Sequence, residues 1–286
     1  NEYRYKGEQM KQCTIAFIGG GNMARSLIGG LISNDFAADY IHVSDANTEA
    51  LDNLTSRYSV KTFTDNLAAI ADADVVILAV KPQQLQSVIR QISPAWQQDK
   101  LLISIAAGIR LDDITRWLDF EQAAIVRAMP NTPSLVQAGA TALCANNYVT
   151  SAQHELAESM LRAVGLALWI SDEKQMDAVT ALSGSGPAYF FLVLEALQTA
   201  GMELGLPEET ARLLALETSF GAAKMALESD ESACVLRQRV TSPGGTTERA
   251  LDVFEEGDLR GLFSKALTAA AQRADELAEQ LGQDYD

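Results

Sequence analysis

The stretch Phe17-Ile18-Gly19-Gly20-Gly21-Asn22-Met23-Ala24 decides the fold that we predict for this chain. It follows an apolar run at residues 13–18, which is typical of a buried strand, and it opens a helical pattern at residues 23–32. A glycine pattern between a strand and a helix is the context of the dinucleotide-binding fingerprint. We therefore predict a dinucleotide-binding fold that begins with this strand.

Each position of the fingerprint has a physical role that its residue can fill. Gly19 permits the tight turn, and Gly21 lets a pyrophosphate approach the backbone. Ala24 is small enough for the helix to pack closely on the strand. Asn22 and Met23 would offer backbone N–H groups at the start of the helix, where anions bind. We expect these five residues to bind the cofactor.

The first half of the chain alternates apolar runs with helical patterns. Further strands are predicted at residues 41–44, 74–80, 101–105, 123–129, 141–145 and 166–170. This alternation is typical of a doubly wound parallel sheet. We assign residues 10–172 to an N-terminal Rossmann domain of the α/β class. The polar residues 1–9 precede Met10, and we interpret them as an extension outside the fold.

The rhythm changes near Asp172, and no strand is predicted after it. Helices are predicted at residues 176–182, 189–204, 208–227, 234–240, 247–256 and 259–281. The segment from Tyr189 to Leu197 is apolar nearly all round apart from Glu195, so we expect this helix to be buried. In a small helical domain such burial often needs a partner subunit. We assign residues 173–286 to an all-helical dimerisation domain.

Composition excludes several classes of function. The 286 residues carry 22 basic and 38 acidic side chains, and the formal net charge of −16 argues against a nucleic-acid surface. The longest apolar runs are far shorter than the ~18 residues that suggest a membrane span. The three cysteines are scattered and form no Cys-x-x-Cys, so we expect no metal site, no disulfide framework and a reducing, cytoplasmic compartment.

A second glycine motif lies far along the chain, in Ser242-Pro243-Gly244-Gly245-Thr246-Thr247. Pro243 stops the preceding helix, and the two glycines allow cramped backbone conformations. Thr246 and Thr247 are expected to open the next helix as hydroxyl caps. The resulting helix start has free N–H groups and two hydroxyls, which suits the carboxylate of a substrate.

This second motif resembles the signature of the pyrroline-5-carboxylate reductases. Four other segments agree with that family in order and spacing: Phe17 to Ala24, Ala79-Val80-Lys81-Pro82, Arg127-Ala128-Met129-Pro130-Asn131-Thr132-Pro133 and Leu182-Ser183-Gly184-Ser185-Gly186-Pro187-Ala188-Tyr189. The resemblance covers nearly the whole chain. It implies reduction of 1-pyrroline-5-carboxylate to L-proline by NADPH or NADH, the final step of proline biosynthesis. It also implies a homodimer formed through the helical domain, sometimes assembled into a ring of dimers.

The choice between NADPH and NADH stays open at this point. Asp45 ends the second strand, where an acid would bind the ribose hydroxyls and disfavour a 2′-phosphate. The resemblance, in contrast, implies common use of NADPH, and it places Asn66 near the adenosine. Lys81 would meet a cofactor phosphate or ribose, since Ala79, Val80, Lys81 and Pro82 follow a central strand.

Two more strand ends are expected to face the nicotinamide. Ala106-Ala107-Gly108 consists of small residues, so Ala107 would leave room for the ring or would simply pack closely. Asn131 would hydrogen-bond the carboxamide or order its own proline-bounded loop.

The chemical site is predicted at two segments of the helical half. Ser183 and Ser185 lie in a glycine-rich break that would let backbone approach a flat substrate. Ser242, Gly244, Gly245 and Thr246 would hold the carboxylate. Thr247 matches the substrate threonine of the family and would hydrogen-bond the ring nitrogen, so we name it as the catalytic residue.

Two other functions remain as alternatives. The first is a β-hydroxyacid-type dehydrogenase, which is weakened because residues 188–195 contain no lysine to act as acid or base. An imine needs less such help, since its protonated form is already electrophilic at carbon. The second is a catalytically silent dinucleotide-binding sensor of redox state. The sequence leaves open the proton donor, feedback by proline, and whether a related cyclic imine is the preferred substrate.

Overall fold

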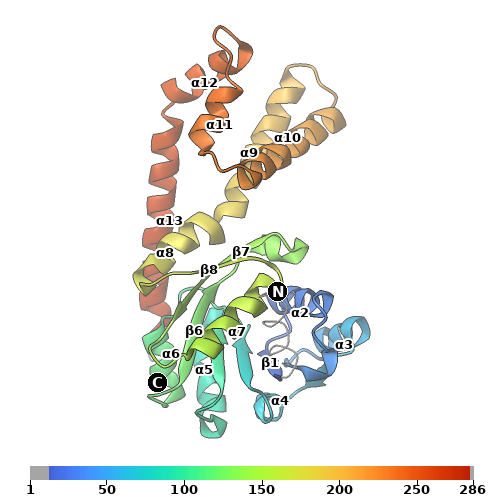
Figure 1. Cartoon of the computed structure of the whole chain (residues 1–286), viewed down its shortest axis with the longest axis vertical. Coiled ribbons are helices and arrows are strands. Elements are labelled where there is room, and N and C mark those ends of the chain that lie inside the picture. The colour runs from blue at the N-terminus through green and yellow to red at the C-terminus, as the bar shows by residue number, and fades with distance from the viewer. Residues whose placement is uncertain (1–12, 284–286) are drawn as a thin grey trace. The chain divides into compact units, whose positions relative to one another are not determined.

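The computed structural model describes residues 13–283, so the extension predicted at residues 1–9 lies outside the described residues. The chain forms two compact units (Figure 1). The first comprises the chain up to Ser185 together with the chain from Ala270 onward, and the second is Gly186–Ala269. These compact units do not test the functional division predicted between residues 172 and 173, which stays a prediction.

The first unit is built on one eight-stranded sheet with the order β3-β2-β1-β4-β5-β6-β7-β8. The strands are β1 (Ile15–Ile18), β2 (Ile41–Ser44), β3 (Lys61–Phe63), β4 (Val75–Leu78), β5 (Leu101–Ser104), β6 (Ala124–Met129), β7 (Gly139–Ala145) and β8 (Gly165–Trp169). Strands β1 to β6 are parallel, and the order reverses between β1 and β4. This is the doubly wound arrangement that the sequence predicts.

Two features of the sheet differ from the prediction. β7 runs antiparallel to β6, and β8 runs parallel to β7. Only nine residues separate Met129 from Gly139, and they hold the short helix η3 (Thr132–Val136). A parallel crossover needs about a dozen residues or more, so this link permits only reversal. β3 was not predicted, because its three residues are not an apolar run.

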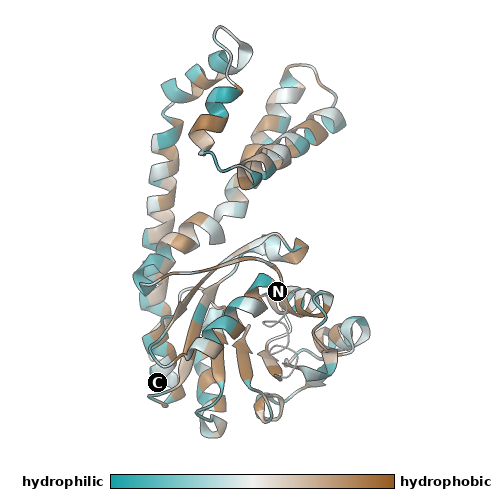
Figure 2. Cartoon of the chain, viewed as in Figure 1, coloured by the Kyte–Doolittle hydropathy of each residue, from teal (hydrophilic) through white to brown (hydrophobic). Residues whose placement is uncertain are grey.

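Helices cover both faces of the sheet. Helices α2 (Asn22–Ser33), α3 (Thr48–Tyr58) and α7 (Ser151–Arg162) share one core cluster with side chains such as Phe17. Helices α4 (Asn66–Ile70), α5 (Pro82–Ile92) and α6 (Leu111–Leu118) share a second cluster with neighbours such as Ile18. Successive strand residues thus enter opposite layers, and the strands are apolar on both faces (Figure 2). The short helices η1 (Ala38–Tyr40) and η2 (Ser93–Ala95) lie in connections.

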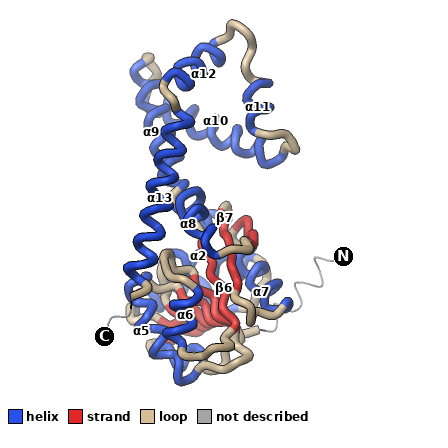
Figure 3. Tube along the Cα trace, turned by 90° about the vertical axis from the view of Figure 1, so that its left-hand side faces the viewer, coloured by secondary structure: helices blue, strands red, loops and turns tan. Residues whose placement is uncertain are grey.

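The helical half of the chain follows the prediction closely. Its elements are η4 (Glu173–Gln175), α8 (Met176–Val179), η5 (Thr180–Gly184), α9 (Gly186–Glu203), α10 (Glu208–Glu228), α11 (Ala233–Arg239), α12 (Thr246–Glu256) and α13 (Leu259–Leu281). None of the described residues after β8 forms a strand (Figure 3). The predicted glycine break before α9 is wrong: η5 is a turn of π-helix, and the Ser185 N–H donates to the Thr180 carbonyl at 2.8 Å.

Within the second unit, α9 and α10 pack side by side. The expected burial of α9 is wrong for the single chain: Phe190 is 71% exposed, and Phe191 and Leu192 are nearly as open. The small residue Ala211 is the only buried apolar side chain of Gly186–Ala269. The second unit therefore has almost no apolar core of its own.

Among residues 13–283, no helix is long and apolar enough to cross a membrane. The same residues contain no cluster of three or more histidine, cysteine or acidic side chains that could hold a metal ion.

Candidate active site

The glycine turn lies where β1 ends, at the point where the strand order of the sheet reverses. Gly19 has φ of +103°, and a Cβ there would lie 2.7 Å from the carbonyl oxygen of Ala79. Only glycine fits both restrictions. Its N–H donates to the Ser44 carbonyl at 2.7 Å, which ties the turn to β2. Gly21 is exposed, and a Cβ there would meet no atom within 4 Å. The approach to the backbone is therefore open.

The start of α2 fits a pyrophosphate. Gly21 is its N-cap residue and contributes no side-chain hydrogen bond, and the first turn holds no acidic residue. The N–H groups of Asn22 and Met23 have no intrahelical acceptor, because the first turn of any helix lacks one. Ala24 is fully buried between α2 and the sheet. The residues of the fingerprint thus offer donors, open space and close packing at the places where a dinucleotide needs them.

Asp45, at the end of β2, has its carboxylate engaged within the chain. Oδ2 accepts a hydrogen bond from the Gly20 N–H at 2.6 Å, and Oδ1 accepts one from the Asn47 N–H at 2.8 Å. The side chain is half-buried. It therefore braces the glycine turn and keeps its negative charge beside it.

Asn66 lies next to this end of β2. Its Oδ1 accepts from the Ser44 hydroxyl at 2.7 Å, and its Nδ2 donates to Gln91 Oε1 at 2.8 Å. A cavity of about 430 Å³ is lined nearby by parts of α3, β3 and α4, including Asp52 and Asp65. None of the residues that line this cavity is basic. The cavity therefore offers no cation to a 2′-phosphate.

The remaining predicted cofactor residues follow the central strands. Ala79 and Val80 are half-buried, and Lys81 is an exposed N-cap residue ahead of Pro82. Lys81 has no side-chain partner among the described residues, so its ammonium group is available to an anion. Ala107 is half-buried.

For residues 106–108 and for Asn131, the sequence allowed either a contact with the nicotinamide or a purely structural role. Gly108, beside Ala107, packs against α13, where a Cβ would lie 3.3 Å from Leu281 Cδ1. Asn131 is buried; its Nδ2 donates to the Ser183 carbonyl at 3.0 Å, and its Oδ1 accepts from the Ala140 N–H at 2.9 Å. Asn131 therefore orders its loop and joins it to η5. A contact with a carboxamide stays a prediction.

The two serines of the π-helical turn differ in availability. Ser183 Oγ donates to the Val179 carbonyl at 3.0 Å, so its hydroxyl is already used within the helix. Ser185 is half-buried, and its hydroxyl has no partner among the described residues. A Cβ on Gly184 would lie 2.7 Å from Met129 Cε. A side chain at position 184 would therefore require the end of the flexible Met129 side chain to shift. Single π-helical turns occur frequently at functional sites.

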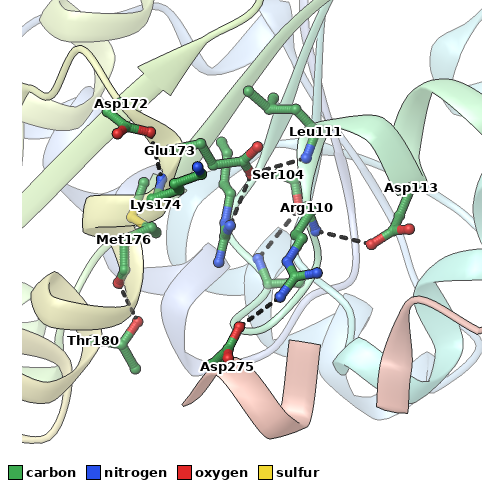
Figure 4. Close-up of polar contacts among 12 residues, drawn as sticks. Ser104, Arg110, Leu111, Asp113, Asp172, Glu173, Lys174, Met176, Thr180 and Asp275 are labelled. Atoms are coloured by element: carbon green, nitrogen blue, oxygen red, sulfur yellow. Dashed lines mark hydrogen bonds and ion pairs between the residues drawn. The ribbon is translucent and has the colours of Figure 1, made fainter. Parts of the chain in front are cut away.

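A buried charge cluster that we did not predict lies beside η4 (Figure 4). Arg127, only 4% exposed in its side chain, donates from Nη1 to Glu173 Oε1 at 2.8 Å. The same oxygen accepts from the Leu111 N–H at 2.9 Å. Burial is the main cause that raises the pKa of nearby Asp177. A charged residue inside the apolar strand β6 could have indicated this cluster from the sequence. Arg127 is also the first residue of the motif Arg127 to Pro133 quoted above.

The second unit carries the Ser242–Thr247 segment. Gly244 has φ of +71°, and Gly245 is the N-cap residue of α12. The expected capping by threonine is wrong: neither Thr246 nor Thr247 makes a side-chain hydrogen bond among the described residues. Both threonines are exposed and sit in the first turn of the helix.

Two backbone N–H groups at the start of α12 already donate hydrogen bonds within the chain. The Gly245 N–H donates to the Ser242 carbonyl at 3.0 Å. The Gly244 N–H donates to Glu248 Oε2 at 2.6 Å. A carboxylate of the chain itself thus occupies one of the donors that we predicted for a substrate.

The first unit therefore brings together the glycine turn, Asp45, Asn66, Lys81 and the Asn131–Ser183 contact. The segment from Ser242 to Thr247 belongs to the second unit. This combination defines a class: proteins that pair a Rossmann dinucleotide domain with a helical domain carrying a second anion-accepting helix start.

Comparisons with known proteins narrow the class. Residues 173–277 match the family model described as pyrroline-5-carboxylate reductase dimerisation, and residues 14–108 match the one described as NADP oxidoreductase coenzyme F420-dependent. The pyrroline-5-carboxylate reductase of Pseudomonas aeruginosa is 50% identical over 269 residues, which cover 94% of this chain and 98% of that protein. The chain belongs to the pyrroline-5-carboxylate reductase family.

Two solved structures agree in fold. The structure of a pyrroline-5-carboxylate reductase from Coxiella burnetii has a TM-score of 0.89 and 51% identity, and the match covers 93% of this chain and 98% of that one. The pyrroline carboxylate reductase of Plasmodium falciparum, solved with NADP bound, has a TM-score of 0.83 and 29% identity, with coverage of 94% and 99%.

Proposed function

We propose that this chain catalyses the reduction of 1-pyrroline-5-carboxylate to L-proline with NADPH or NADH. The observation that carries the proposal is the identity of 50% to a protein of that name along nearly the whole of both chains. The open glycine turn at the switch point of the sheet supports the dinucleotide part. The helix start of α12, which holds a carboxylate of its own chain, supports the anionic substrate.

The residues of the first unit would hold the cofactor. The N–H groups of Asn22 and Met23 bind the pyrophosphate, with Gly19, Gly21 and Ala24 shaping the turn. When bound, NAD(P)H supplies the hydride that adds to C5 of the imine. The chain's task is then to position and desolvate the two reactants.

The residues of α12 would hold the substrate. The start of this helix, with Ser242, Gly244, Gly245 and Thr246, binds the carboxylate. The Thr247 hydroxyl hydrogen-bonds the ring nitrogen, where the proton of the product amine is held. We also propose a substrate contact for Ser183, through its backbone, and for Ser185, through its hydroxyl. Because Glu248 occupies the Gly244 N–H in the free chain, substrate binding displaces its carboxylate.

The assembly follows from the second unit. Its exposed apolar helices, and the match of residues 173–277 to a dimerisation model, support a homodimer formed through this unit. We further propose a ring of such dimers, a cytoplasmic location, and the functional division into a dinucleotide domain at residues 10–172 and a substrate and dimerisation domain at residues 173–286.

The test is the loss of reduced nicotinamide absorbance when purified protein meets racemic 1-pyrroline-5-carboxylate, with NADPH and NADH in parallel. We expect substrate-dependent oxidation of the cofactor and equimolar proline, identified by mass spectrometry. Folded protein that binds the cofactor yet forms no proline with either one would overturn the proposal.

A further inference from the structure

A second cavity lies along α2 in the first unit. It has a volume of about 370 Å³ and is walled by α2, by the end of α3 and by η3 and the residue that follows it. Its wall runs from Asn22 to Ser33, so it extends about 16 Å along the helix, at 1.5 Å per residue. It therefore continues well beyond the helix start that we assign to the cofactor. A volume of this size admits a small metabolite.

The charges of this cavity differ from those of the rest of the surface. Arg25 and Arg57 both line it, whereas no acidic residue does. Among the described residues neither arginine has a carboxylate within ion-pair distance. Ten other arginines each pair with one: Arg110, Arg116, Arg127, Arg162, Arg212, Arg237, Arg239, Arg249, Arg260 and Arg273. In a chain of net charge −16, two such guanidinium groups at one cavity concentrate positive potential there.

Arg57 differs from the corresponding arginine of α7 in having no carboxylate partner within the part of the chain that the structure describes. It lies in the last turn of α3, where a cation complements the helix dipole. Arg162 holds the same place in α7, yet it pairs with Glu158 at 2.8 Å. Arg57 instead rests against the ring of Tyr58, with its guanidinium carbon 5.2 Å from the ring centroid. Arg57 lines the cavity, and its guanidinium group has no hydrogen-bond acceptor among the described residues.

The wall supplies further hydrogen-bonding groups. Ser26 and Ser134 both belong to it, and their hydroxyls are buried without a hydrogen-bond partner among the described residues. Ser134 is only 1% exposed. The Ser134 hydroxyl lies against Gly139, so these two groups are not donors to the cavity. The exposed polar side chains of Ser33 and Gln137 line the same wall. Arg25 uses one donor on Asn22 Oδ1, which leaves most of its guanidinium free.

We propose that this cavity is a second anion site, which binds the phosphate group of a small metabolite. Guanidinium groups are donors that suit a tetrahedral oxyanion, and this cavity is lined by two of them. The cavity shares Asn22 with the helix start that we assign to the cofactor, whereas Arg25 and Arg57 have no role in that site. The proposal does not depend on which imine the chain reduces.

Calorimetric titration of the full-length protein tests the site. The two probes are inorganic phosphate and ribose 5-phosphate, at constant ionic strength. Saturating NADP⁺ is present so that the glycine turn is already occupied. The test variant is Arg57→Gln, and the matched control is Arg162→Gln, which removes the same charge from the same turn of another helix.

We expect saturable binding to the wild type and to the control, and about a tenfold or greater loss of affinity in Arg57→Gln. Tighter binding of ribose 5-phosphate would identify an ester as the ligand, and equal binding of the two probes would identify free phosphate. An equal loss in both variants would mean a general charge effect and would overturn the site. So would the absence of saturable binding to the wild type, whatever the stability of the variants.

Discussion

The carboxylate of Asp45 and the backbone N–H of Gly20 are joined by a hydrogen bond of 2.6 Å. The bond links the end of β2 to the glycine turn after β1, across the two strands that flank the adenosine end of a Rossmann site. Asp45 therefore has two effects at once. It holds the turn in shape, and in the cofactor site that we propose its negative charge would lie near the 2′-phosphate of NADPH.

Asp45→Asn separates these effects, because an amide oxygen can still accept from Gly20. We expect the ratio of kcat/KM for NADPH to that for NADH to rise about tenfold, since removing one charge near the 2′-phosphate is worth about 1 kcal/mol or more at this depth. Asp39→Asn is the control, because it removes an exposed charge at the other end of β2. An unchanged ratio would show that Asp45 acts on the turn alone.

Thr247 permits a clean test of catalysis. Its hydroxyl is exposed and caps nothing, so Thr247→Ala should leave the thermal midpoint nearly unchanged. If the hydroxyl holds the ring nitrogen, kcat should fall about 100-fold or more.

Thr247→Ser supplies the control for this prediction, because it keeps the hydroxyl and should keep most of the turnover. The measurement is steady-state kinetics beside thermal unfolding of each variant. Turnover by Thr247→Ala at the wild-type rate would remove Thr247 from the chemistry.

Glu248 should compete with the substrate for the helix start of α12. Its carboxylate already accepts from the Gly244 N–H, and Glu248→Gln removes the charge while keeping an acceptor. We expect KM for 1-pyrroline-5-carboxylate to fall roughly threefold with kcat little changed, because an anion then meets less repulsion. Glu209→Gln changes net charge equally on exposed α10 and should leave KM unaltered. A KM that rises in Glu248→Gln would contradict the competition.

The sequence predicts those parts of the fold that depend on local pattern. The central strands β1, β4 and β5 are largely apolar runs, and the structure shortens each by at most two residues at either end. β3 was not predicted because its three partly exposed residues show no hydrophobic periodicity. The antiparallel direction of β7 depends on its pairing with β6, and the local sequence pattern of a strand does not encode its neighbour.

The rest of the site depends on contacts over long distances in the chain. Arg127 and Glu173 are 46 residues apart, and their pairing appears only when β6 and η4 meet. The open face of α9 depends on a second chain, so an apolar pattern could not say what covers it. The prediction that Thr246 and Thr247 cap α12 was wrong for another reason. Glycine can itself be an N-cap residue, and with Gly245 in that place the threonines after it need not cap.

Lys100 should be a strong determinant of stability. It is 4% exposed, and its Nζ donates to the carbonyls of Ile70, Ala71 and Ala73 at 3.1, 3.2 and 2.7 Å. These carbonyls follow the end of α4, where a cation is favourable. Lys100→Met removes this donor from all three carbonyls, of which Ile70 keeps the Ala73 N–H, and should lower the free energy of unfolding by about 2–3 kcal/mol.

Urea denaturation followed by tryptophan fluorescence measures this loss. Lys61→Met is the control: Lys61 is exposed on β3, and its change should stay within about 0.5 kcal/mol. A loss of that small size in Lys100→Met would show that water replaces the ammonium group without cost.

The buried cysteines should be unreactive in the folded protein. Burial, helped by the nearby Asp74 carboxylate, raises the pKa of Cys13 from 9.0 to about 11. Burial likewise raises the pKa of Cys144, with Glu173 as the next cause. At about pH 8 the two-unit shift alone lowers the thiolate fraction of Cys13 about 100-fold. Iodoacetamide labelling followed by peptide mass spectrometry should show Cys13 modified at least that much more slowly in native protein than in urea, and Cys144 more slowly as well.

The same shift makes stability depend on pH at the alkaline end. The folded pKa of Cys13 lies above the unfolded one, so its contribution is fully present below about pH 9 and is lost as the pH rises through about 11. The free energy of unfolding should therefore fall by up to about 2 kcal/mol across this window, beyond any general alkaline trend. Cys13→Ala should show only the general trend, because no thiol remains to ionise. Identical slopes in the two proteins would mean that the Cys13 thiolate is accommodated in the native state, and that burial does not hold the proton on its sulfur.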